Sequence, residues 1–330
     1  MFWIYLILIN IVAFIVYGID KFKAQKGSWR VPERFLIGLA VFGGSLGAGI
    51  SMLVFRHKIR KRKFYITVPV LILLQAALCA WGYYQNNHLT VSYYELDIGL
   101  GHEMTIVQVS DLHAKAFGKD PGNLLDEIME IKPDIIVVTG DAVDGQYPGF
   151  DKAERFFEGA VKIAPVYYIS GNHEEMLSES SRDEYYEKIG KMGVILADDQ
   201  VFNVDGLIIA GIGDLTLTRL GTPERFKIFD AFSADDAVLL LAHEPDHTDL
   251  YTRLGADLVL AGHVHGGQVI IPGVGGLLSP DVDFFPDYYE GLYEAGGEAD
   301  TRMIVSRGIG NSVLPLRINN YPELVVVTVK

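Results

Sequence analysis

Five short runs of metal-binding residue types stand out from residue 111 onward, each directly after an apolar segment. They combine aspartate, asparagine and histidine and contain no cysteine. The runs are Asp111-Leu112-His113, Gly140-Asp141, Gly171-Asn172-His173-Glu174, His243-Glu244 and Gly262-His263-Val264-His265-Gly266-Gly267-Gln268. A single histidine or aspartate after a strand usually only hydrogen-bonds a loop, but these runs hold five of the nine histidines. We therefore expect their side chains to meet at one site.

The chemistry of this set favours divalent metal ions. Carboxylates, an amide oxygen and imidazoles without a thiolate suit borderline to hard ions such as Mn, Fe, Zn or Ni. The candidate ligands exceed what one tetrahedral ion needs, so the sequence predicts two ions that share a carboxylate. Two ions about 3.5–4 Å apart can clamp the attacking and leaving oxygens of an in-line displacement at phosphorus. A water molecule between them would lose its proton near neutral pH and attack as hydroxide.

The apolar segments before these runs are typical of buried strands, and amphipathic segments separate them. The predicted strands are Thr105–Ser110, Asp134–Gly140, Val166–Ser170, Leu207–Gly211, Ala237–Ala242 and Asp257–Ala261. The predicted helices are Pro121–Lys132, Asp151–Lys162, Arg182–Met192, Pro223–Phe232 and Asp246–Leu254. This alternation indicates an α/β domain, in which side chains at the carboxyl ends of the strands converge. Two further apolar runs, Met303–Ser306 and Leu324–Val329, predict a second sheet.

Length and charge divide the chain into two parts. The 330 residues favour two domains. Residues 1–85 carry eleven Lys and Arg against two Asp and Glu, whereas residues 86–330 carry seventeen against forty. The acidic part offers no broad basic surface, so nucleic acid is not expected as a partner. The single cysteine, Cys79, excludes an intramolecular disulfide and a cysteine-based zinc cluster.

Three apolar runs in the basic part have the length of membrane helices. About 20 apolar residues span the hydrocarbon core, so we expect helices at about residues 1–17, 35–55 and 64–84 in a transmembrane domain of residues 1–85. A cleaved signal peptide is the alternative for the first run, which lacks a basic start and a small-residue cleavage site. Residues 86–102 then form a linker with the first strand region, and residues 103–330 form the soluble domain.

The second apolar run contains a cluster of small residues that bears on how its helix packs. The cluster Gly43-Gly44-Ser45-Leu46-Gly47 lets helix backbones approach closely. We favour a tight hairpin inside the bundle, with a dimer interface or a re-entrant loop as alternatives.

Two basic loops lie around residues 21–34 and 56–63. The positive-inside rule places both in the cytoplasm, but three full spans would put them on opposite sides of the membrane. The second loop is denser in charge, so we place it inside. The protein is then a multi-pass protein of the cell membrane with an extracytoplasmic catalytic domain.

The basic part resembles a small bacterial family of integral membrane proteins of unknown function. The residues that carry this resemblance are Asp20-Lys21, Trp29-Arg30-Val31-Pro32-Glu33, the Gly43–Gly47 cluster and Arg56-His57-Lys58. The resemblance covers roughly residues 1–85 and implies a membrane location without a particular chemistry. It makes His57 a packing or headgroup residue rather than a metal ligand.

The acidic part resembles the calcineurin-like metallophosphoesterase superfamily over about residues 103–330. The matching motifs are D-x-H (Asp111, His113), G-D-x-x-D (Gly140, Asp141, Asp144), G-N-H-E (Gly171–Glu174), His243 and G-H-x-H (Gly262–His265). The resemblance implies a four-layer α/β/β/α sandwich around two metal ions. It implies that Asp111, His113 and His265 hold one ion. The other would be held by Asn172, His243 and His263, with Asp141 bridging the pair.

Neighbouring residues receive roles from the same resemblance and from their chemistry. His173 would stand beside the leaving group and donate a proton, with a merely hydrogen-bonding role as the alternative. Asp144 and Glu174 would orient the ligands or the imidazole. Arg307 and Arg317 would contact phosphate, or else serve as structural ion-pair partners.

The motifs near the C-terminus narrow the expected substrate. They resemble those of a branch of membrane-tethered bacterial phosphoesterases and are Gly262–Gln268, Val305–Asn311, Leu314–Arg317 and Pro322–Leu324. Some members of that branch act on UDP-2,3-diacylglucosamine or cleave phospholipids, so the resemblance implies a lipid-linked substrate. Tyr288, Tyr289 and the stretch Phe284-Phe285-Pro286 would give the site an apolar rim near the headgroups, with ordinary core or loop packing as the alternative.

We therefore predict a membrane-anchored dimetal phosphoesterase that cleaves a phosphodiester or pyrophosphate bond, with the lipid bilayer as its setting and no obligate protein partner. One alternative is a phosphodiesterase that acts on soluble nucleotides. Another is a membrane protein that binds metal without catalysis. The complete set of catalytic residue types favours the enzyme.

Overall fold

The computed structural model describes residues 2–115, 122–146, 149–214, 232–233, 236–280, 283–295, 301–311 and 316–330. They divide into two compact units, which we call the helical unit (residues 2–84) and the sheet unit (Gln85–Ser312 and Leu316–Lys330).

The helical unit contains the predicted membrane helices. Its elements are α1 (Phe2–Gln25), α2 (Glu33–Leu39), a π-helical turn (Ala40–Gly44), α3 (Ser45–Val54) and α4 (Arg62–Asn86), whose last residues belong to the sheet unit. Three stretches, Phe2–Gln25, Glu33–Val54 and Arg62–Asn86, are long and apolar enough to cross a membrane. The first and third are longer than the predicted 1–17 and 64–84, because polar residues at their ends continue the helix.

The middle stretch is bent, which corrects the expectation of one helix over residues 35–55. The helical path breaks at Phe42 and Gly43, where Gly43 has a φ of 103°, in the region that favours glycine. The side chain of Asn10 spans the break, since its Nδ2 donates to the carbonyl of Gly43 and its Oδ1 accepts from the N–H of Gly47, at 2.8 and 2.7 Å. A Cβ on Gly47 would lie 2.0 Å from the carbonyl oxygen of Asn10. The predicted tight hairpin is therefore confirmed.

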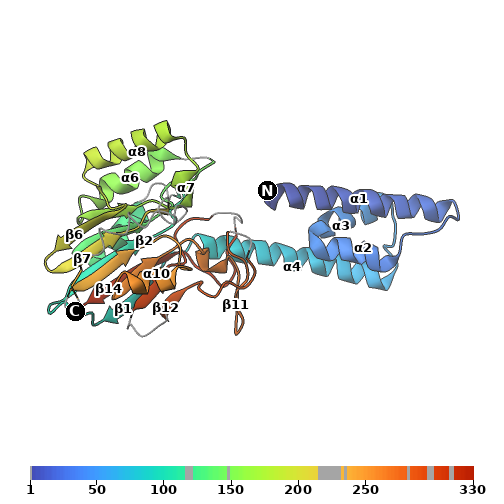
Figure 1. The fold of residues 1–330 in the computed structure, drawn as a ribbon. Helices are drawn as coiled ribbons and strands as arrows, with labels where there is room; N and C mark the ends of the chain where they lie inside the picture. The colour runs from blue at the N-terminus through green and yellow to red at the C-terminus, as the bar shows by residue number, and fades with distance from the viewer. Residues whose placement is uncertain are drawn as a thin grey trace. The chain divides into compact units, whose positions relative to one another are not determined.

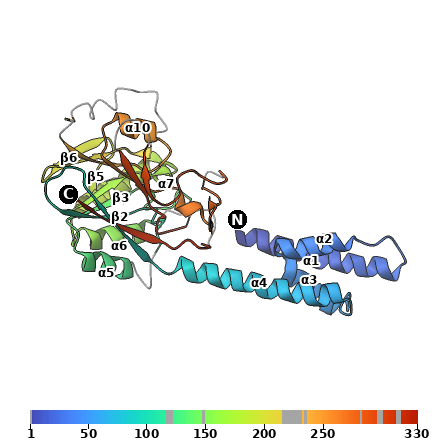
Figure 2. The same ribbon diagram turned by 90° about the horizontal axis from the view of Figure 1, so that it is seen from below.

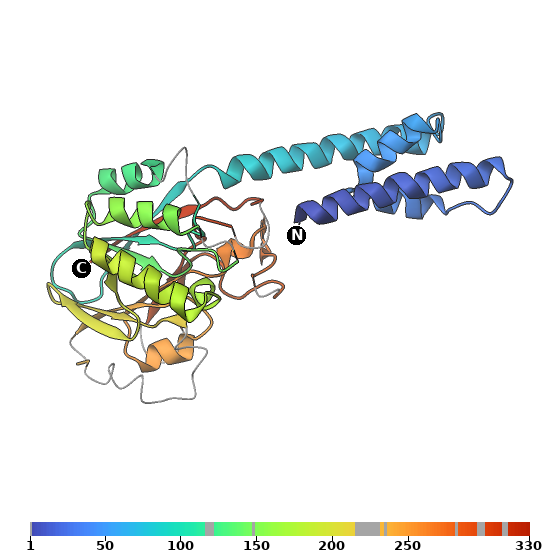
Figure 3. The same ribbon diagram turned by 90° about the horizontal axis from the view of Figure 1, so that it is seen from above.

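The hairpin brings the two basic loops to the same end of the helical unit (Figure 3). The buried carboxylate of Asp20 accepts a hydrogen bond from the N–H of Val31 at 2.9 Å. It also contacts Nε2 of His57 at 2.8 Å and Nζ of Lys58 at 3.1 Å. Because the second run folds back at Gly43, the two basic loops lie together at one end of the helical unit.

The first sheet of the sheet unit has six strands in the order β1-β14-β2-β3-β4-β5. Their bounds are β1 (Thr90–Leu96), β2 (Met104–Val109), β3 (Ile135–Thr139), β4 (Val166–Ile169), β5 (Ile195–Leu196) and β14 (Glu323–Val329). Strands β2 to β5 are parallel, and β14 is antiparallel to β2 with Val325 opposite Gln108. The run Leu324–Val329 thus belongs to the first sheet and not to the predicted second one. Its partners lie far away in sequence, so its own composition does not reveal which sheet it joins.

The second sheet also has six strands, in the order β12-β13-β9-β8-β7-β6. Their bounds are β6 (Gln200–Val204), β7 (Leu207–Gly211), β8 (Ala237–Leu241), β9 (Leu258–Ala261), β12 (Gly291–Glu294) and β13 (Arg302–Val305). A short hairpin of β10 (Ile270–Ile271) and β11 (Gly275–Gly276) follows β9. The six predicted strands are confirmed with small shifts at their ends, and the run from Met303 forms β13 of this sheet.

The helices lie on the outer faces of the two sheets (Figures 1 and 2). Their bounds are α5 (Gly122–Ile131), α6 (Phe150–Ala160), α7 (Asn172–Glu175), α8 (Glu179–Met192) and α10 (Thr248–Arg253). One apolar core lies between the first sheet and α5, α6 and α8, a second between the sheets, and a third between the second sheet and α10. This is the expected four-layer α/β/β/α sandwich. The predicted helix at residues 223–232 falls almost wholly outside the described residues.

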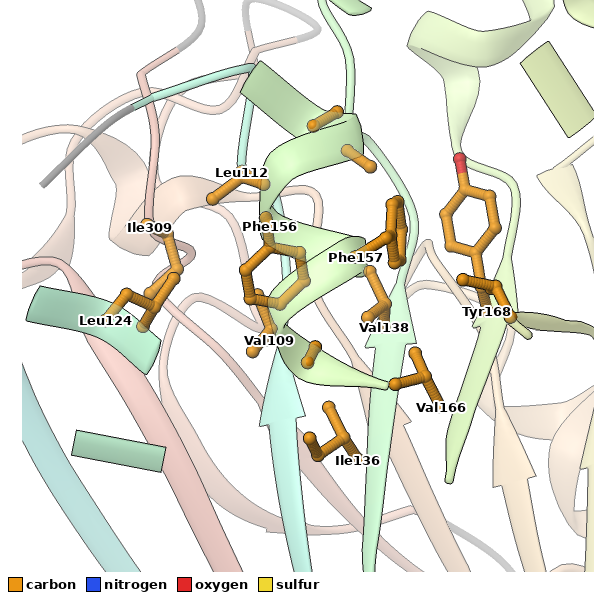
Figure 4. Packing of buried hydrophobic residues seen from close by; sticks show 14 of the residues in the cluster. Val109, Leu112, Leu124, Ile136, Val138, Phe156, Phe157, Val166, Tyr168 and Ile309 are labelled. Atoms are coloured by element: carbon orange, nitrogen blue, oxygen red, sulfur yellow. The ribbon is translucent and has the colours of Figure 1, made fainter. Parts of the chain in front are cut away.

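Helix α6 illustrates how the sequence attaches a helix to the sheet. Ala153, Phe156, Phe157 and Ala160 recur at helical spacing and are all fully buried. Phe156 and Phe157 point toward Val109, Val138 and Val166 of β2, β3 and β4 (Figure 4). This packing holds in place the strands whose carboxyl ends carry the candidate site.

Candidate metal centre

The structure gathers the predicted metal ligands at the carboxyl ends of strands from both sheets. Asp111 and Asp141 follow β2 and β3, Asn172 begins α7 after β4, and His243 and His263 follow β8 and β9. Potential ligand atoms lie within 4.8 Å of one another in three groups: Asp111, His113 and His265; His113, Asp141 and His173; and Asp141, His243 and His263. Since the groups share His113 and Asp141, they form one cluster.

The first half of this cluster consists of Asp111, His113 and His265. The Nε2 atoms of the two histidines are 3.0 Å apart, and Nε2 of His265 is 3.6 Å from Oδ1 of Asp111. The N–H of His263 donates to both carboxylate oxygens of Asp111 at 3.1 Å, and Ser110 Oγ donates to Oδ2 at 2.6 Å. Burial lowers the pKa of His113, and that of His265 falls well below its usual value. Both rings are therefore neutral at pH 7, as metal ligands must be.

The second half consists of Asn172, His243 and His263. Nδ1 of His243 donates to the carbonyl of Thr139 at 2.9 Å, so Nε2 of the neutral ring carries a lone pair. This Nε2 lies 3.1 Å from Oδ1 of Asn172 and 3.2 Å from Nδ1 of His263. Oδ1 of Asn172 is also 3.1 Å from Nδ1 of His263.

These contacts test whether the residues suit a metal ion. Oδ1 of Asn172 and Nε2 of His243 are both acceptors, and one proton on Nδ1 of His263 can satisfy only one of them. The contact therefore requires a cation or an added proton. Burial acts to lower the pKa of His243, yet Asp141, whose Oδ2 lies 3.4 Å from Nε2, raises this pKa well above its usual value. The surroundings thus favour positive charge at this point, and the donor set fits a divalent ion.

Asp141 lies between the two halves. Its Oδ2 is 3.7 Å from Nε2 of His113 and 3.4 Å from Nε2 of His243. Its Oδ1 accepts the N–H of His173 at 2.8 Å, which fixes the carboxylate. Although burial acts to raise it, the pKa of Asp141 is lowered by His243, His113 and His173. The carboxylate is ionised and placed to bridge two cations.

The backbone is strained where the ligands gather. Five of the predicted ligands have positive φ: Asp111 (51°), His113 (44°), Asp141 (51°), His263 (68°) and His265 (51°). Such conformations cluster at functional sites because they aim side chains at a ligand. Gly140 and Gly262 let the strand ends approach, since a Cβ on either would lie 2.3 Å from Nδ1 of His243 or 1.8 Å from Oγ of Ser110, respectively.

His173 is placed differently from the buried ligands. Its Nδ1 accepts the N–H of Gly145 at 3.0 Å, which leaves the proton of the neutral ring on Nε2. Nε2 lies 4.0 Å from Oδ2 of Asp141, and the ring meets that of His113 edge to face. The side chain is 13% exposed, against 2% for His113, so it borders both the cluster and solvent. A proton donor in this position can reach a substrate oxygen.

Glu174 organises the loops that carry the ligands. Its Oε2 accepts the N–H groups of Asp141 and Gly171 at 2.9 and 2.8 Å, and its Oε1 accepts that of Val143 at 3.2 Å. Burial, followed by the nearby Asp141, raises the pKa of Glu174 to about 7. Asp144 accepts the N–H of Gln146 at 2.8 Å, and its predicted action on an imidazole stays a prediction.

The two arginines that are predicted to contact phosphate both pair with groups of the protein itself. Arg307 pairs with Glu290 at 3.2 Å and with Glu323 at 3.1 Å. The guanidinium of Arg317 is fully buried and donates to the carbonyls of Arg307 and Gly308, at 2.8 and 3.2 Å, and to that of Gly310. These contacts favour the alternative of a structural role, above all for Arg317, whereas Nε of Arg307 has no hydrogen-bond partner among the described residues. The phosphate contact stays a prediction.

Asp214 was missed by the sequence reasoning. It is buried, its Oδ1 has no hydrogen-bond partner in the described part of the chain, and it interacts electrostatically with His243, His263 and Asp141. Burial raises its pKa to about 6. It follows β7 in the run Gly211-Ile212-Gly213-Asp214, so the rule that located the other ligands, a polar residue after a buried strand, also points to it.

Comparison with known proteins agrees with this geometry. Residues 104–267, which include every predicted ligand, match the model of the calcineurin-like phosphoesterase family, and residues 10–64 match a family described as protein of unknown function (DUF1294). The chain is 31% identical over 233 residues to the uncharacterized metallophosphoesterase YkuE of Bacillus subtilis, covering 68% of this chain and 78% of YkuE.

Two further relatives match different parts. The chain is 28% identical over 240 residues to the phosphodiesterase YaeI of Escherichia coli, covering 67% of this chain and 80% of YaeI. It is 45% identical over 76 residues to the uncharacterized protein YsdA of Bacillus subtilis, covering 23% of this chain and 85% of YsdA. Calcineurin-like phosphoesterases use dinuclear divalent metal centres, and the Asp and His clusters described above suit one. The chain belongs to the calcineurin-like phosphoesterase family and is a metal-dependent phosphoester hydrolase.

Proposed function

We propose that this hydrolase is anchored in a membrane and cleaves a phosphodiester or pyrophosphate bond of a lipid-linked substrate. The observation that carries the hydrolytic part is the 3.1 Å contact between Oδ1 of Asn172 and Nε2 of His243, two acceptors beside the ionised Asp141. That contact requires a cation or an added proton at the place where the strands of both sheets end, and the surrounding carboxylates and imidazoles suit a divalent ion.

The residues divide into three roles in this proposal. Asp111, His113 and His265 hold one ion, Asn172, His243 and His263 hold the other, and Asp141 binds both. The bound ions supply an activated water and neutralise charge on the phosphoryl oxygens. His173 donates a hydrogen bond from its Nε2–H to the leaving oxygen and stabilises the negative charge there, because Gly145 fixes the tautomer through Nδ1; the oxygen then takes its proton from solvent. The neighbouring Glu174 holds the loops that contain Asp141 and Gly171 together by accepting a hydrogen bond from each.

An exposed apolar loop beside the site supports the lipid-linked substrate. Phe284 is 66% exposed and Phe285 is 52% exposed, and Val274 at the tip of the β10–β11 hairpin is 63% exposed. Phe285 has a φ of 59°, an unusual conformation for an aromatic residue, which holds it in an outward loop. Large exposed apolar side chains in a cluster mark a surface that meets another apolar phase.

Hydrogen bonds connect this loop both to the metal ligands and to helix α4. The N–H of Phe285 donates to Leu277, and that of Leu278 donates to Gly267, two residues beyond His265. On the other side, the side chain of Asn319 donates to the carbonyl of Ile270 in β10, and the N–H of Asn319 donates to Oε1 of Gln85 at 2.7 Å. Gln85 is in the last turn of α4 and is the first residue of the sheet unit.

The fold-back at Gly43 supports an extracytoplasmic catalytic domain. With both basic loops on the cytoplasmic side, α1 and α4 are the two helices that cross the bilayer from end to end. The chain beyond α4 then lies on the opposite side. Cleavage of the full chain by an external protease in intact cells tests this placement, and protection of the sheet unit would contradict it.

The hydrolytic part is tested with bis-p-nitrophenyl phosphate and the full-length protein in detergent. We expect turnover with Mn²⁺ that His263→Ala lowers by about a hundredfold or more. Absence of metal-dependent turnover on any phosphoester would leave a protein that only binds metal. Equal activity on soluble nucleotides with and without lipid vesicles would instead support the nucleotide phosphodiesterase.

The lipid-linked part requires a paired variant. Replacing Phe284 and Phe285 by serine is expected to lower hydrolysis of a phospholipid diester in vesicles by about tenfold, with turnover of bis-p-nitrophenyl phosphate changed by less than about twofold. The control replaces two equally exposed apolar residues elsewhere in the sheet unit, Tyr93 and Met129, by serine. An equal loss in both variants would contradict a specific lipid-facing loop.

A further inference from the structure

The basic end of the helical unit contains a polar cavity that the hydrolytic function does not use. Its volume is about 580 Å³ and its charged lining is Arg30, Glu33, Arg56, Lys58, Arg60 and Lys61. These residues come from two loops that are joined only through the fold-back at Gly43. The cavity is therefore a product of the tertiary structure of this unit.

The acidic groups at this end neutralise only part of the positive charge. Asp20 lies beneath the cavity and pairs with Lys58 at 3.1 Å and with His57 at 2.8 Å. Glu33 pairs with Lys58 at 3.4 Å and with Lys61. Both carboxylates are thus occupied by lysines and a histidine, which also lock the two loops together.

Three arginines remain unneutralised. Arg30, Arg56 and Arg60 line the cavity, are exposed, and form no ion pair among the residues that the structure describes. A guanidinium group can donate two parallel hydrogen bonds to phosphate oxygens. An arginine that is not paired with a carboxylate has these donors available for a phosphate. The cavity therefore has the charge and the donors for an anionic phosphate ester.

An apolar groove adjoins the same segment of chain. It has a volume of about 630 Å³ and is lined by Pro32, Arg34, Phe35, Gly38, Leu39 and Phe42. Phe35, Gly38, Leu39 and Phe42 recur at helical spacing, so the groove follows one face of α2 and the turn after it for roughly 10 Å. Trp29, which is 91% exposed, stands next to Arg30, as tryptophans do at the level of lipid headgroups.

We propose that the helical unit binds one anionic phospholipid, with its phosphate among Arg30, Arg56 and Arg60 and an acyl chain along the groove of α2. A ligand with a charged head and an apolar tail fits both cavities at once, whereas a free phosphate uses only one. This site does not depend on the proposed hydrolytic function, because none of its residues belongs to the sheet unit.

The test measures retention of phosphatidylglycerol by the full-length protein in detergent micelles, with phosphatidylcholine as the neutral comparison. The variant R30Q/R56Q/R60Q is expected to retain phosphatidylglycerol about tenfold less tightly. The matched control K23Q/K26Q/K63Q removes three exposed charges from the same end outside the cavity and is expected to change retention by less than about threefold. Equal losses in both variants would overturn the proposal in favour of diffuse attraction.

Two further experiments test whether the groove binds an acyl chain and whether the cavity binds free phosphate. A Cβ at Gly38 meets no atom within 4 Å, so Gly38→Phe fills the groove without strain on the helix. It is expected to weaken retention of the diacyl lipid while glycerophosphoglycerol binds as before. Competition by inorganic phosphate at the same concentration as the lipid, or equal retention of phosphatidylcholine, would overturn the proposal. Helical circular dichroism of each variant verifies that the unit remains folded.

Discussion

The guanidinium of Arg317 lies 3.4 Å from Nδ1 of His265. Arg317 has the largest fully buried side chain among the described residues. Arg317 also donates to Asn320, whose side chain in turn donates to the carbonyl of His265 at 2.7 Å. Together with burial and His113, it keeps the pKa of His265 well below its usual value. Residues of the last segment of the chain thus hold His265, a predicted metal ligand, in position.

This arrangement predicts that Arg317 acts on stability. Arg317→Met would remove the donor to the carbonyls of Arg307 and Gly310 and one of the two donors to that of Gly308, and is expected to cost about 3–5 kcal/mol of unfolding free energy. Arg307→Gln, on the more exposed arginine, is expected to cost about 1 kcal/mol. Hydrogen exchange of β14 amides in urea measures both. A higher KM for Arg317→Lys at unchanged stability would instead indicate phosphate binding.

His173 is expected to affect the departure of the leaving oxygen, through the hydrogen bond from Nε2, and not metal binding. His173→Asn removes the donor at Nε2 and should lower kcat by about a hundredfold or more for a substrate with an alkoxide leaving group. The loss should be much smaller for p-nitrophenolate, which leaves without a proton. Metal content is the control, and it should stay at the wild-type value. A drop to half that value would make His173 a ligand.

The metal content of ligand variants tests the division of the cluster into two halves. His243→Ala removes Nε2 from the second half and is expected to lower the bound divalent metal from two ions to about one per chain. Elemental analysis after gel filtration provides the count. His247→Ala is the matched control, because His247 pairs with Glu244 at 2.9 Å and is in none of the ligand groups. Unchanged metal content in His243→Ala would contradict the assignment.

The raised pKa of Glu174 predicts how the stability of the metal-free protein depends on pH. Its pKa is about 7 in the folded chain, above the usual value of about 4.3 in an unfolded one. The folded state therefore binds the proton more tightly, and the resulting stability is present below about pH 4.3 and is lost as the pH rises through about 7. The loss between pH 5 and pH 8 should be at most about 3 kcal/mol.

Hydrogen exchange of β3 amides after treatment with a chelator is the measurement, because the three tryptophans, Trp3, Trp29 and Trp81, all lie in the helical unit. Glu174→Gln should show a flatter profile over the same range. Added Mn²⁺ should also flatten the wild-type profile, because cations beside Asp141 favour the ionised form of Glu174. A wild-type stability that rises steadily from pH 5 to 8 without metal would contradict this role.

The candidate ligands could be located from sequence because each is a local feature. Asp111, Asp141, His243 and His263 each follow a buried strand within two residues, and parallel strands end at a shared edge. Their residue types then select the chemistry. Asp214 lies three residues after the end of β7 and stands alone in its run, so the local pattern singles it out less clearly.

Other features required the tertiary structure, since they depend on partners that are remote in sequence. The composition of the run at Leu324 indicates a strand, but only its pairing with β2 decides which sheet it joins. An arginine such as Arg317 looks the same in sequence whether it faces a phosphate or buried carbonyls. Likewise, the apolar run at 35–55 has the length of a full span, and the close approach of Asn10 to Gly47 is what folds it back.

By itself, therefore, the sequence determined the two-part organisation, the α/β class and the residue types of a divalent metal site, because alternation, charge and strand endings are encoded locally. The three-dimensional packing alone decided which acceptors face one another around Asp141, which protein groups the two arginines contact, and that two basic loops share one end of the helical unit. Such relations are set by the contacts of distant segments, which no local pattern of residues records.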